Sequence, residues 1–434
     1  MTAEQPVADH SVARPDYDPY ANTHRADPYG VYTRLRAESP VFYSPVMNAW
    51  VLTRYDDVVA VLTDTKRFSA VGSIGIDPFT SFPLEVQRIF DQGYERFPGL
   101  IEMDPPTHST YRSLVNLAFT PRRVAALEPR IRQLTDDLVD TFAAEGRADF
   151  TRAFAFPLPM IVICEILGVP HQDMQSVQTM ADGFRALEAG NMWKLPVAEQ
   201  MQVAGSFVDF QHYAAGLIGD RRQHPREEDL LTTLLSAELG GKRPLTTEEL
   251  VSSVIHLLFA GTETTARMLS SALWHLLDPR ETWEELRRDP ALAANAVEEA
   301  LRMEPPVIYH LRQTREAVRF GDVEIPAGQP VHLLFASANR DAAAFHDAED
   351  FDVHREGITR HLGFGRGPHF CVGAPIGRLE GRVALEVLLQ RLPSVRLQTG
   401  YEPEPEEHLM LRGLERLPIE WDTATLVPRS TPID

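Results

Sequence analysis

The chain has 434 residues, 44% of them hydrophobic, and a formal net charge of −20 at pH 7. The length and apolar content suffice for a large core, and the negative charge disfavours nucleic-acid or anionic-membrane binding. Two cysteines argue against a disulfide framework and favour a reducing compartment. The first 30 residues lack a secretory signal pattern, and no run reaches the ~18 apolar residues of a membrane span. We therefore expect a soluble, cytoplasmic protein.

In chain order, residues 1–27 lack a regular pattern and are expected to be mobile. Residues 28–36 have the pattern of a short helix. The alternating segments 40–43 and 49–53 flank a polar turn and predict a β-hairpin. A second helix is expected at 56–63.

A long irregular stretch, residues 69–103, comes next, and loops of this length in a compact domain tend to be functional or disordered. Strong helical patterns follow at 106–145, 158–192, 197–222, 228–237, 247–277 and 281–303. Strand-like segments lie near 317–325 and 330–335, with a further pair near 394–397 and 409–421. Because no linker-like break separates these elements, we expect one mainly α domain over residues 28–434, with small peripheral β-sheets.

Cys371 is the most informative residue of the chain. Glycines precede and follow it, and a helical pattern starts directly beyond. Glycines let the backbone approach a bulky flat group, and a helix N-terminus favours thiolate over thiol. An iron ligand requires such a sulfur anion on an open platform. The other cysteine, Cys164, lies in an apolar run and is expected to be buried packing.

Two other interpretations of this region are weaker. A nucleotide-binding loop needs a second strand with an acidic residue about 20 residues on, but residues 378–389 are helical in pattern. Four histidines spaced by seven or eight residues suggest a metal site, at His346, His354, His361 and His369. No His-Glu-x-x-His or paired Cys-x-x-Cys motif supports that site. We therefore treat these histidines as separate residues.

The segment Phe364–Gly373 resembles the haem-binding loop of the cytochrome P450 family, Phe-Gly-x-Gly-x-His-x-Cys-x-Gly, and fills every fixed position. The resemblance extends over about residues 28–422 and implies a single mainly α domain. It implies haem b between a long central helix and the helix after the cysteine loop, with Cys371 as the iron ligand. The loop residues expected to contact the haem are Phe364, His369 and Gly373.

The sequence Ala-Gly-Thr-Glu-Thr-Thr begins at Ala260, inside one of the longest helical patterns. Glycine and threonine are poor helix formers, and threonine hydroxyls compete for carbonyls one turn back, so we expect local distortion. The resemblance implies that Ala260 and Gly261 leave room for O2 and substrate. It also implies that Glu263 and Thr264 deliver protons. The alternative is a surface carboxylate beside a threonine that packs between helices.

The resemblance implies four residues that hold the haem propionates: His108, Arg112, Arg312 and His369. Two anionic arms need several cationic donors, and arginine suits bidentate contact with a carboxylate. Taken singly, each of the four reads as a solvated surface residue. His361 is a weaker candidate for the same role.

Glu299 and Arg302 form a Glu-x-x-Arg pair on one helix face. The resemblance implies a structural ion pair that supports the cysteine loop, completed by an arginine from the segment before that loop. Asp350 stands where many relatives have this arginine. The third partner is therefore left open.

The resemblance implies a haem-thiolate monooxygenase that inserts one oxygen atom of O2 into a medium or large organic substrate. By analogy, this substrate belongs to bacterial secondary metabolism, such as antibiotic biosynthesis. A peroxide-driven peroxygenase and a non-catalytic haem sensor are the alternatives. The family's variable pocket segments match 69–103, the region around 180–200, 307–310 and 408–410, where Tyr309 and His310 are candidate anchors for a polar group.

Electrons are expected from a separate ferredoxin and its reductase, because only Cys371 is suited to bind iron and the sequence has no flavin-binding domain. Seven arginines stand out on this acidic chain: Arg122, Arg123, Arg130, Arg132, Arg366, Arg378 and Arg382. They predict either a docking face for an acidic ferredoxin or a solvated charged face.

Overall fold

The structure is a computed structural model of the chain. It describes residues 12–14, 16–21, 24, 26–73, 82–117, 119–188, 192, 195–226, 229–241, 243–406, 408 and 410–429. Of the segment predicted to be mobile, residues 1–11 lie outside this part. Within the described part, Tyr17 is buried and its ring contacts that of Phe42, with 5.4 Å between centroids.

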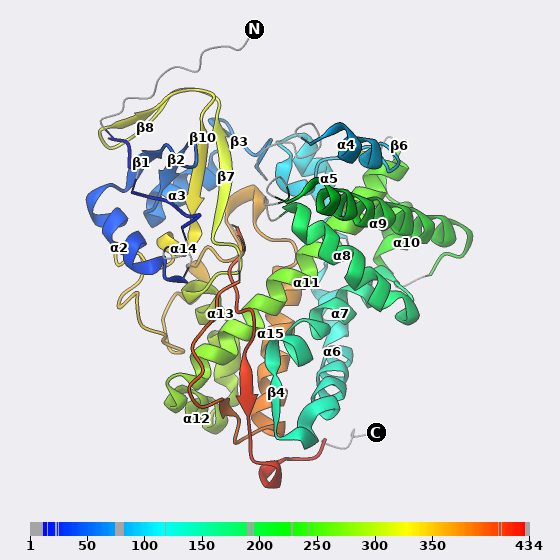
Figure 1. The fold of residues 1–434 in the computed structure, drawn as a ribbon, viewed down its shortest axis with the longest axis vertical. Helices are drawn as coiled ribbons and strands as arrows, with labels where there is room; N and C mark the ends of the chain where they lie inside the picture. The colour runs from blue at the N-terminus through cyan, green and yellow to red at the C-terminus, as the bar shows by residue number, and fades with distance from the viewer. Residues whose placement is uncertain are drawn as a thin grey trace.

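Helices make up most of the molecule, and a sheet region packs against them at one side (Figure 1). The longer helices are α6 (Pro121–Phe142), α7 (Pro157–Leu167), α8 (Met174–Glu188), α9 (Val197–Gln223), α11 (Thr247–Leu277), α13 (Ala293–Met303) and α15 (Ala374–Arg391). The shorter ones are α2 (Tyr29–Glu38), α3 (Tyr55–Thr63), α4 (Leu84–Phe90), α5 (Thr107–Asn116), α10 (Leu230–Leu235), α12 (Arg280–Arg288) and α14 (Phe335–Ala338). Helix α11 crosses the centre and packs on α7, α9, α13 and α15.

The predicted helices are present, but three of the predicted ranges are divided. The range 106–145 separates into α5 and α6 because Thr120 caps α6: its hydroxyl accepts a hydrogen bond from Arg123 N. The range 158–192 is interrupted after α7 by Gly168, whose φ of +73° ends the helix. The range 281–303 separates into α12 and α13 at Asp289 and Pro290.

A capping box fixes the start of α11. The hydroxyl of Thr246 accepts from Glu249 N, and the Glu249 carboxylate accepts from Thr246 N at 2.7 Å. Helix α4 lies within the stretch predicted to be irregular, of which residues 74–81 are outside the described residues. Among the helices of the described part, none combines the length and apolar character needed to cross a membrane.

The main sheet has the strand order β1-β2-β10-β7-β3. Its strands are β1 (Val41–Ser44), β2 (Ala49–Leu52), β10 (Pro330–Leu334), β7 (Tyr309–Thr314) and β3 (Phe68–Ser69). The predicted hairpin is confirmed, with Val41 opposite Leu52. Strand β7 was not predicted; it pairs antiparallel with β10, so that Val331 lies opposite Arg312. Residues two apart on a strand share a face, which places His310 and Arg312 on one side of β7.

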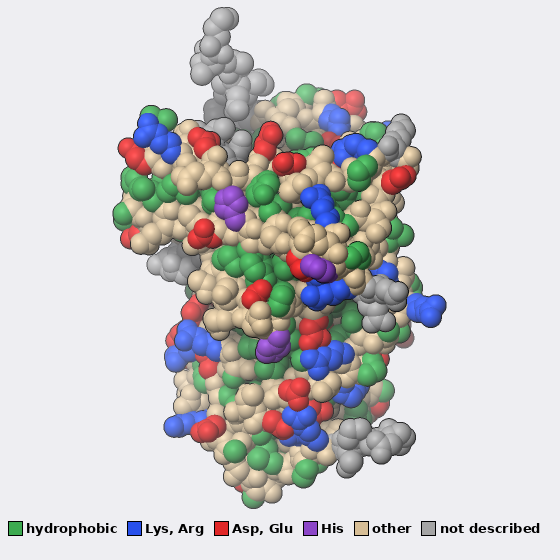
Figure 2. Space-filling model, turned by 90° about the vertical axis from the view of Figure 1, so that its right-hand side faces the viewer, with side chains coloured by type: hydrophobic (Ala, Val, Ile, Leu, Met, Phe, Trp, Pro, Cys, Tyr) green, Lys and Arg blue, Asp and Glu red, His purple; other side chains and the backbone are tan. Residues whose placement is uncertain are grey.

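The remaining sheets are small and peripheral, as predicted. They are β11 (Arg396–Leu397), β12 (Pro418–Glu420) and β4 (Arg147–Asp149); β8 (Val318–Phe320) with β9 (Val323–Ile325); and β5 (Glu238–Leu239) with β6 (Arg243–Pro244). Among the described residues of the predicted strand region 409–421, the named strand is residues 418–420. Basic and acidic side chains are interspersed on the face that Figure 2 shows.

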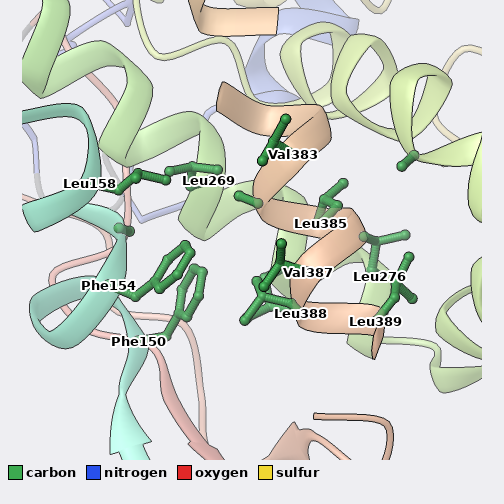
Figure 3. Packing of buried hydrophobic residues seen from close by; sticks show 14 of the residues in the cluster. Phe150, Phe154, Leu158, Leu269, Leu276, Val383, Leu385, Val387, Leu388 and Leu389 are labelled. Carbon is green, nitrogen blue, oxygen red and sulfur yellow. The ribbon is translucent and has the colours of Figure 1, made fainter. Parts of the chain in front are cut away.

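The core around α15 holds the end of the cysteine loop in place. Leucine and valine side chains of α15 pack against Leu269 and Leu276 of α11 and against Phe150 and Phe154, whose stacked rings have centroids 5.0 Å apart (Figure 3). Gly381 lets three helices meet: a Cβ there would lie 2.8 Å from Val297 of α13 and 2.9 Å from Met268 of α11. The cysteine loop therefore leads into a rigid helix.

Candidate functional site

A cavity of about 320 Å³ lies between α11 and the cysteine loop. Cys371 borders it on one side, and Ala260 and Thr264 of α11 border it on the other. Its wall is mostly apolar, and α5 and β7 close one end with basic side chains. The cavity therefore joins the predicted iron ligand to the predicted oxygen-binding segment.

Backbone geometry fixes the cysteine loop. Cys371 N donates to Phe364 O at 2.8 Å, which closes the turn. Gly365 and Gly367 have φ of +66° and +69°, a conformation that glycine adopts readily. A Cβ on Gly367 would lie 2.6 Å from the carbonyl oxygen of Leu62, so the loop passes directly against the end of α3. Phe364 borders the cavity, and Gly373 faces the Cys371 sulfur, from which a Cβ would lie 3.8 Å away.

The side chain of Cys371 is exposed toward the cavity, and opposing influences act on the pKa of its thiol. Burial by the surrounding protein raises its pKa, although Gly373 N–H, Arg112 and Ala374 N–H all act in the opposite direction. The helix N-terminus thus favours the thiolate, as expected, but desolvation outweighs it. A cation bonded to the sulfur supplies the missing stabilisation. The site therefore fits an iron ligand better than a free nucleophile.

Helix α11 continues without a break through the predicted distortion. The predicted back-bonds are present: Thr262 Oγ1 donates to Leu258 O and Thr264 Oγ1 donates to Ala260 O, both at 2.8 Å. Ala260 borders the cavity, whereas Gly261 faces α7, where a Cβ would lie 3.0 Å from Ile163. Gly261 therefore allows close helix packing and is not placed to make room for O2.

Glu263 and Thr264 point in different directions. Thr264 borders the cavity, but Glu263 is not among the residues of its wall. The Glu263 carboxylate is buried and forms an ion pair with Arg267, at 2.5 Å between Oε2 and Nη1. The alternative of a surface carboxylate is therefore wrong, and the predicted acid–alcohol pair is not assembled in this conformation.

Basic side chains from three parts of the chain converge at one end of the cavity. They are His108 and Arg112 on α5, His310 and Arg312 on β7, and His369 in the cysteine loop. The His108 and His369 rings lie 4.1 Å apart. Both ring nitrogens of His108 and Nδ1 of His310 are buried and have no hydrogen-bond partner in the described part of the chain. These four predicted propionate partners are thus brought together, with His310 as a fifth member.

No member of this cluster forms an ion pair with a carboxylate among the described residues, although the charge of Asp104 acts on His108 and Arg312 without such a contact. Burial lowers the pKa of His310 and His369 to about 3 each, and the charge of Arg312 acts in the same direction. Burial also lowers the pKa of Arg312 to about 10. Carboxylates placed here accept from the orphaned nitrogens and offset the positive charge. The donor set therefore fits the two propionates of haem.

The weaker candidate, His361, lies elsewhere. It is buried against Glu298, with 3.1 Å between His361 Nε2 and Glu298 Oε2. Although burial raises the pKa of Glu298, hydrogen bonds from His361 and Arg378 lower it to about 2. His361 therefore supports the cysteine loop from outside the cavity.

The predicted Glu299–Arg302 pair is fully buried, with 2.7 Å between Oε1 and Nη2. Its third partner is Arg355, whose Nε lies 3.0 Å from Glu299 Oε1. Asp350, at the position where relatives have arginine, contributes its backbone carbonyl to both arginines. An arginine five residues further along the chain thus completes the network.

Sequence reasoning misplaced or missed three residues. Tyr309, a predicted substrate anchor, is not part of the cavity wall; its ring packs on His332 at 4.8 Å. His310, the other predicted anchor, lies with the propionate partners, and its spacing of two from Arg312 was the available signal. Glu380 on α15 is buried, and burial raises its pKa to about 8 despite a hydrogen bond with Thr265. Nothing in the sequence marks this carboxyl as unusual.

Comparisons with known proteins agree with this geometry. The family model described as cytochrome P450 matches residues 42–421. Cytochrome P450 107B1 of Saccharopolyspora erythraea is 38% identical over 425 residues, which cover 93% of this chain and 98% of the relative. Mycinamicin IV hydroxylase/epoxidase of Micromonospora griseorubida is 39% identical over 422 residues, or 94% of this chain and 99% of the relative.

Among solved structures, the Tepidiphilus thermophilus P450 heme domain superposes with a TM-score of 0.88 at 30% identity, covering 96% of this chain and 99% of that one. The predicted fold class is confirmed by this match. The chain belongs to the cytochrome P450 family and is an oxidoreductase of the monooxygenase type with haem b as its cofactor.

Proposed function

We propose that this chain inserts one oxygen atom of O2 into a medium or large, mainly apolar organic substrate held in the cavity. The observation that carries the proposal is the cavity itself, which has Cys371, Thr264 and the basic cluster on its wall. When bound, haem b supplies the binding and activation of O2. The protein supplies the ligand, the orientation and the protons.

Each role falls on a residue of the cavity wall. Cys371 would hold the iron through its sulfur. The basic cluster would orient the cofactor through its carboxylates, with members His108, Arg112, His310, Arg312 and His369. Phe364 and Ala260 would bound the cofactor and substrate space.

Thr264 is the residue best placed to pass a proton into the cavity. Its hydroxyl donates to Ala260 O, which leaves the oxygen lone pairs free to accept a hydrogen bond, and rotation about the Cβ–Oγ1 bond would direct the hydroxyl proton into the cavity. Thr264→Ala should still bind haem and substrate but should form less product per reduced nicotinamide consumed, with the remainder released as hydrogen peroxide. Positioned proton transfer contributes roughly 10²–10⁴-fold to a rate.

Thr262→Ala is a matched control for this experiment. Thr262 makes the same back-bond from the same helix but lies outside the cavity wall. It should leave the product ratio unchanged. An unchanged ratio in Thr264→Ala would remove Thr264 from the mechanism.

We propose a separate ferredoxin and its reductase as the electron source. Turnover with such a system, compared with peroxide alone, separates the three functions considered from the sequence. A monooxygenase needs the reductant, a peroxygenase works with peroxide alone, and a sensor shows turnover with neither. The position of Thr264 on the cavity wall favours the first.

The substrate class rests on the cavity and on a relative. Mycinamicin IV hydroxylase/epoxidase is named for oxidation of mycinamicin IV, and we propose a substrate from bacterial secondary metabolism for this chain as well. Candidate compounds that bind in the cavity should shift the absorbance spectrum of the haem-loaded protein. The predicted cytoplasmic location stays a prediction.

A further inference from the structure

We propose that His256 on α11 is a specificity-determining residue that anchors a hydrogen-bond donor of the substrate, such as a hydroxyl group, about 12 Å from the carbon that is oxidised. This anchor rests on the proposed function, because it lies in the same cavity as Thr264 but two helical turns away. It narrows the substrate to an elongated, mainly apolar molecule with a donor group remote from its reacting end.

Helix α11 carries a row of side chains along the cavity. Ser252, His256, Ala260 and Thr264 follow one another at intervals of four residues, and all four border the cavity. An α-helix rises about 1.5 Å per residue, so His256 lies about 12 Å from Thr264 along the helix axis. The neighbouring segment 97–101 contributes only apolar residues to the wall. The α11 row therefore offers a mainly apolar substrate a polar contact far from the reacting carbon.

A chain of hydrogen bonds decides which nitrogen of His256 carries the proton. Ser252 Oγ donates to Phe97 O at 2.6 Å, so this hydroxyl has no second proton to give. His256 Nδ1 lies 2.7 Å from Ser252 O and 3.1 Å from Ser252 Oγ. A carbonyl oxygen only accepts, so Nδ1 is the donor, and Nε2 is the acceptor of the neutral ring.

The surroundings keep this ring neutral. Burial lowers the pKa of His256, although the hydrogen bond with Ser252 O and the charge of Glu102 act in the opposite direction. Glu102 is itself paired with Arg96, at 2.6 Å between Oε2 and Nη2, and the charge of Arg96 lowers the pKa of His256 further. A neutral ring with its proton on Nδ1 selects a hydroxyl or amine N–H and disfavours a carboxylate, which only accepts.

Gly99 defines the position of the ring from its other edge. A Cβ on Gly99 would lie 2.9 Å from Cδ2 and from Nε2 of His256, so the ring edge packs directly on glycine backbone. The segment that contains Gly99 also accepts the Ser252 hydrogen bond, through Phe97 O. Because both edges of the ring are held, the place of the acceptor is well defined. A substrate donor need only replace whichever group donates to Nε2 before binding.

The test measures the binding of three probes with the same carbon chain to haem-loaded protein: dodecyl alcohol, dodecyl methyl ether and dodecanoate. Only the alcohol donates a hydrogen bond, because the ether and the carboxylate only accept. Titration followed by the absorbance spectrum should give the wild type an affinity about three- to tenfold higher for the alcohol than for the ether, the range of one net hydrogen bond. Dodecanoate should bind more weakly than the alcohol.

Variants assign this preference to one side chain. His256→Phe keeps a ring without nitrogens and should bind the alcohol and the ether equally, with the ether affinity near that of wild type. His256→Gln offers a carboxamide oxygen as acceptor and should keep part of the preference. Ser253→Ala is the matched control, because Ser253 borders the same cavity but donates its hydroxyl to Glu249 O at 2.7 Å; it should keep the full preference. If His256→Phe does not fold, His256→Leu takes its place, with the same loss expected.

The position of oxidation is a second readout, which simple loss of packing would not predict. With O2 and the ferredoxin system, the wild type should oxidise dodecyl alcohol mainly toward the end of the chain remote from its hydroxyl. His256→Phe should spread oxidation over more carbons, because the chain is then free to slide in the cavity.

The outcomes separate the anchor from the function on which it rests. Equal affinities of alcohol and ether in the wild type, tighter binding of dodecanoate, or a preference that survives His256→Phe would overturn the anchor and leave oxygen insertion in place. An unchanged product distribution in His256→Phe, or a preference lost in Ser253→Ala, would overturn it as well. A wild type that binds none of the three probes would instead contradict the apolar substrate cavity of the proposed function.

Discussion

On the cysteine side of the cavity, charged groups are closed into compact networks, and backbone geometry leaves little choice of residue. Glu299, Arg302 and Arg355 share one buried network, and Gly367 lies against the backbone of α3. On the opposite side, Thr264 and the apolar wall come from segments far apart in the sequence. The cysteine loop is therefore specified by a short contiguous motif, and the substrate side by scattered side chains.

The two sides also differ in where their charged side chains lie relative to the cavity wall. The cofactor side has a basic cluster that forms no ion pair with a carboxylate of the described residues, which fits the haem carboxylates. The substrate side keeps its charges outside the cavity wall, as in the pair between Glu263 and Arg267. This difference implies that mutations on the cofactor side act on cofactor retention and stability, whereas those on the substrate side act on the reaction. The following predictions test it.

The largest expected effect is loss of the iron ligand. Cys371→Ala, reduced and treated with carbon monoxide, should lose the red-shifted Soret band of thiolate-ligated iron completely. Cys164→Ala is the control, because Cys164 is fully buried in the core and away from the cavity. It should keep the band. A thiolate spectrum that survives Cys371→Ala would contradict the assignment of the whole site.

Breaking the buried network should come next. Glu299→Gln leaves Arg302 and Arg355 buried without their carboxylate, and such a change costs about 3–5 kcal/mol of unfolding free energy. Glu324→Gln removes an exposed pair with Arg319 and should cost about 1 kcal/mol or less. Urea unfolding of both variants measures the difference. Equal losses of unfolding free energy would show that the buried Glu299 network contributes no more to stability than an exposed ion pair.

The same contrast explains what the sequence could predict. The cysteine loop and the Glu299–Arg302 pair were recognised because each motif is short and its chemistry demands particular residue types, whereas the propionate role of His108, Arg112, Arg312 and His369 stays a prediction. The pairing of Arg267 with Glu406 could not be found, because the two are distant in sequence and ordinary in type. Gly261 was misassigned because a glycine in a helix can leave room either for a cavity or for a closely packed neighbouring helix. Only the position of Ile163 shows that Gly261 allows close helix packing.

The predicted helix and strand boundaries were wrong where a local feature, such as a capping residue, ends an element although the apolar periodicity continues. Thr120 and Gly168 divided two predicted helices by capping. Strand β7 was missed because its side chains alternate between the basic cluster and the sheet's other face, which hides the apolar alternation of an ordinary strand. The sequence motifs also do not identify the substrate, because the cavity wall is assembled from many segments.

A pH profile tests how strongly the folded protein buries the carboxyl of Glu380 on α15. Burial raises the pKa of Glu380 from its ordinary value near 4.5 to about 8, so between these values the folded chain binds a proton that the unfolded chain has lost. Stability from this group is therefore present below pH 4.5 and falls as pH rises through the window, by at most about 1.4 kcal/mol per pH unit.

Glu380→Gln should remove this slope, so that its stability relative to wild type improves from pH 4.5 to 8 and is constant above. The difference between the two curves is the measurement. It cancels the contributions of buried histidines, which act with the opposite sign below their ordinary pKa. Parallel curves would show that Glu380 is solvated in the folded protein.

The smallest expected effect concerns the predicted docking face. Four of the seven arginines are ion-paired with carboxylates of this chain: Arg130, Arg132, Arg378 and Arg382. Arg122 and Arg366 are exposed and have no acidic partner among the described residues, which makes them the better candidates for contact with an acidic ferredoxin.

Charge reversal at Arg122 and Arg366 together should slow electron delivery several-fold at low salt and leave substrate affinity unchanged, because rim charges act mainly on association. The effect should shrink as added salt shortens the Debye length below ~10 Å. Arg382→Glu is the control: because Arg382 is already paired with Glu128 and Glu386, its reversal should affect stability more than electron delivery. Stopped-flow reduction by a ferredoxin over a salt series measures both. If the rate of reduction changes with neither the charge reversal nor the salt concentration, these arginines form only a solvated face. The cysteine side would then bind its electron donor without charge complementarity.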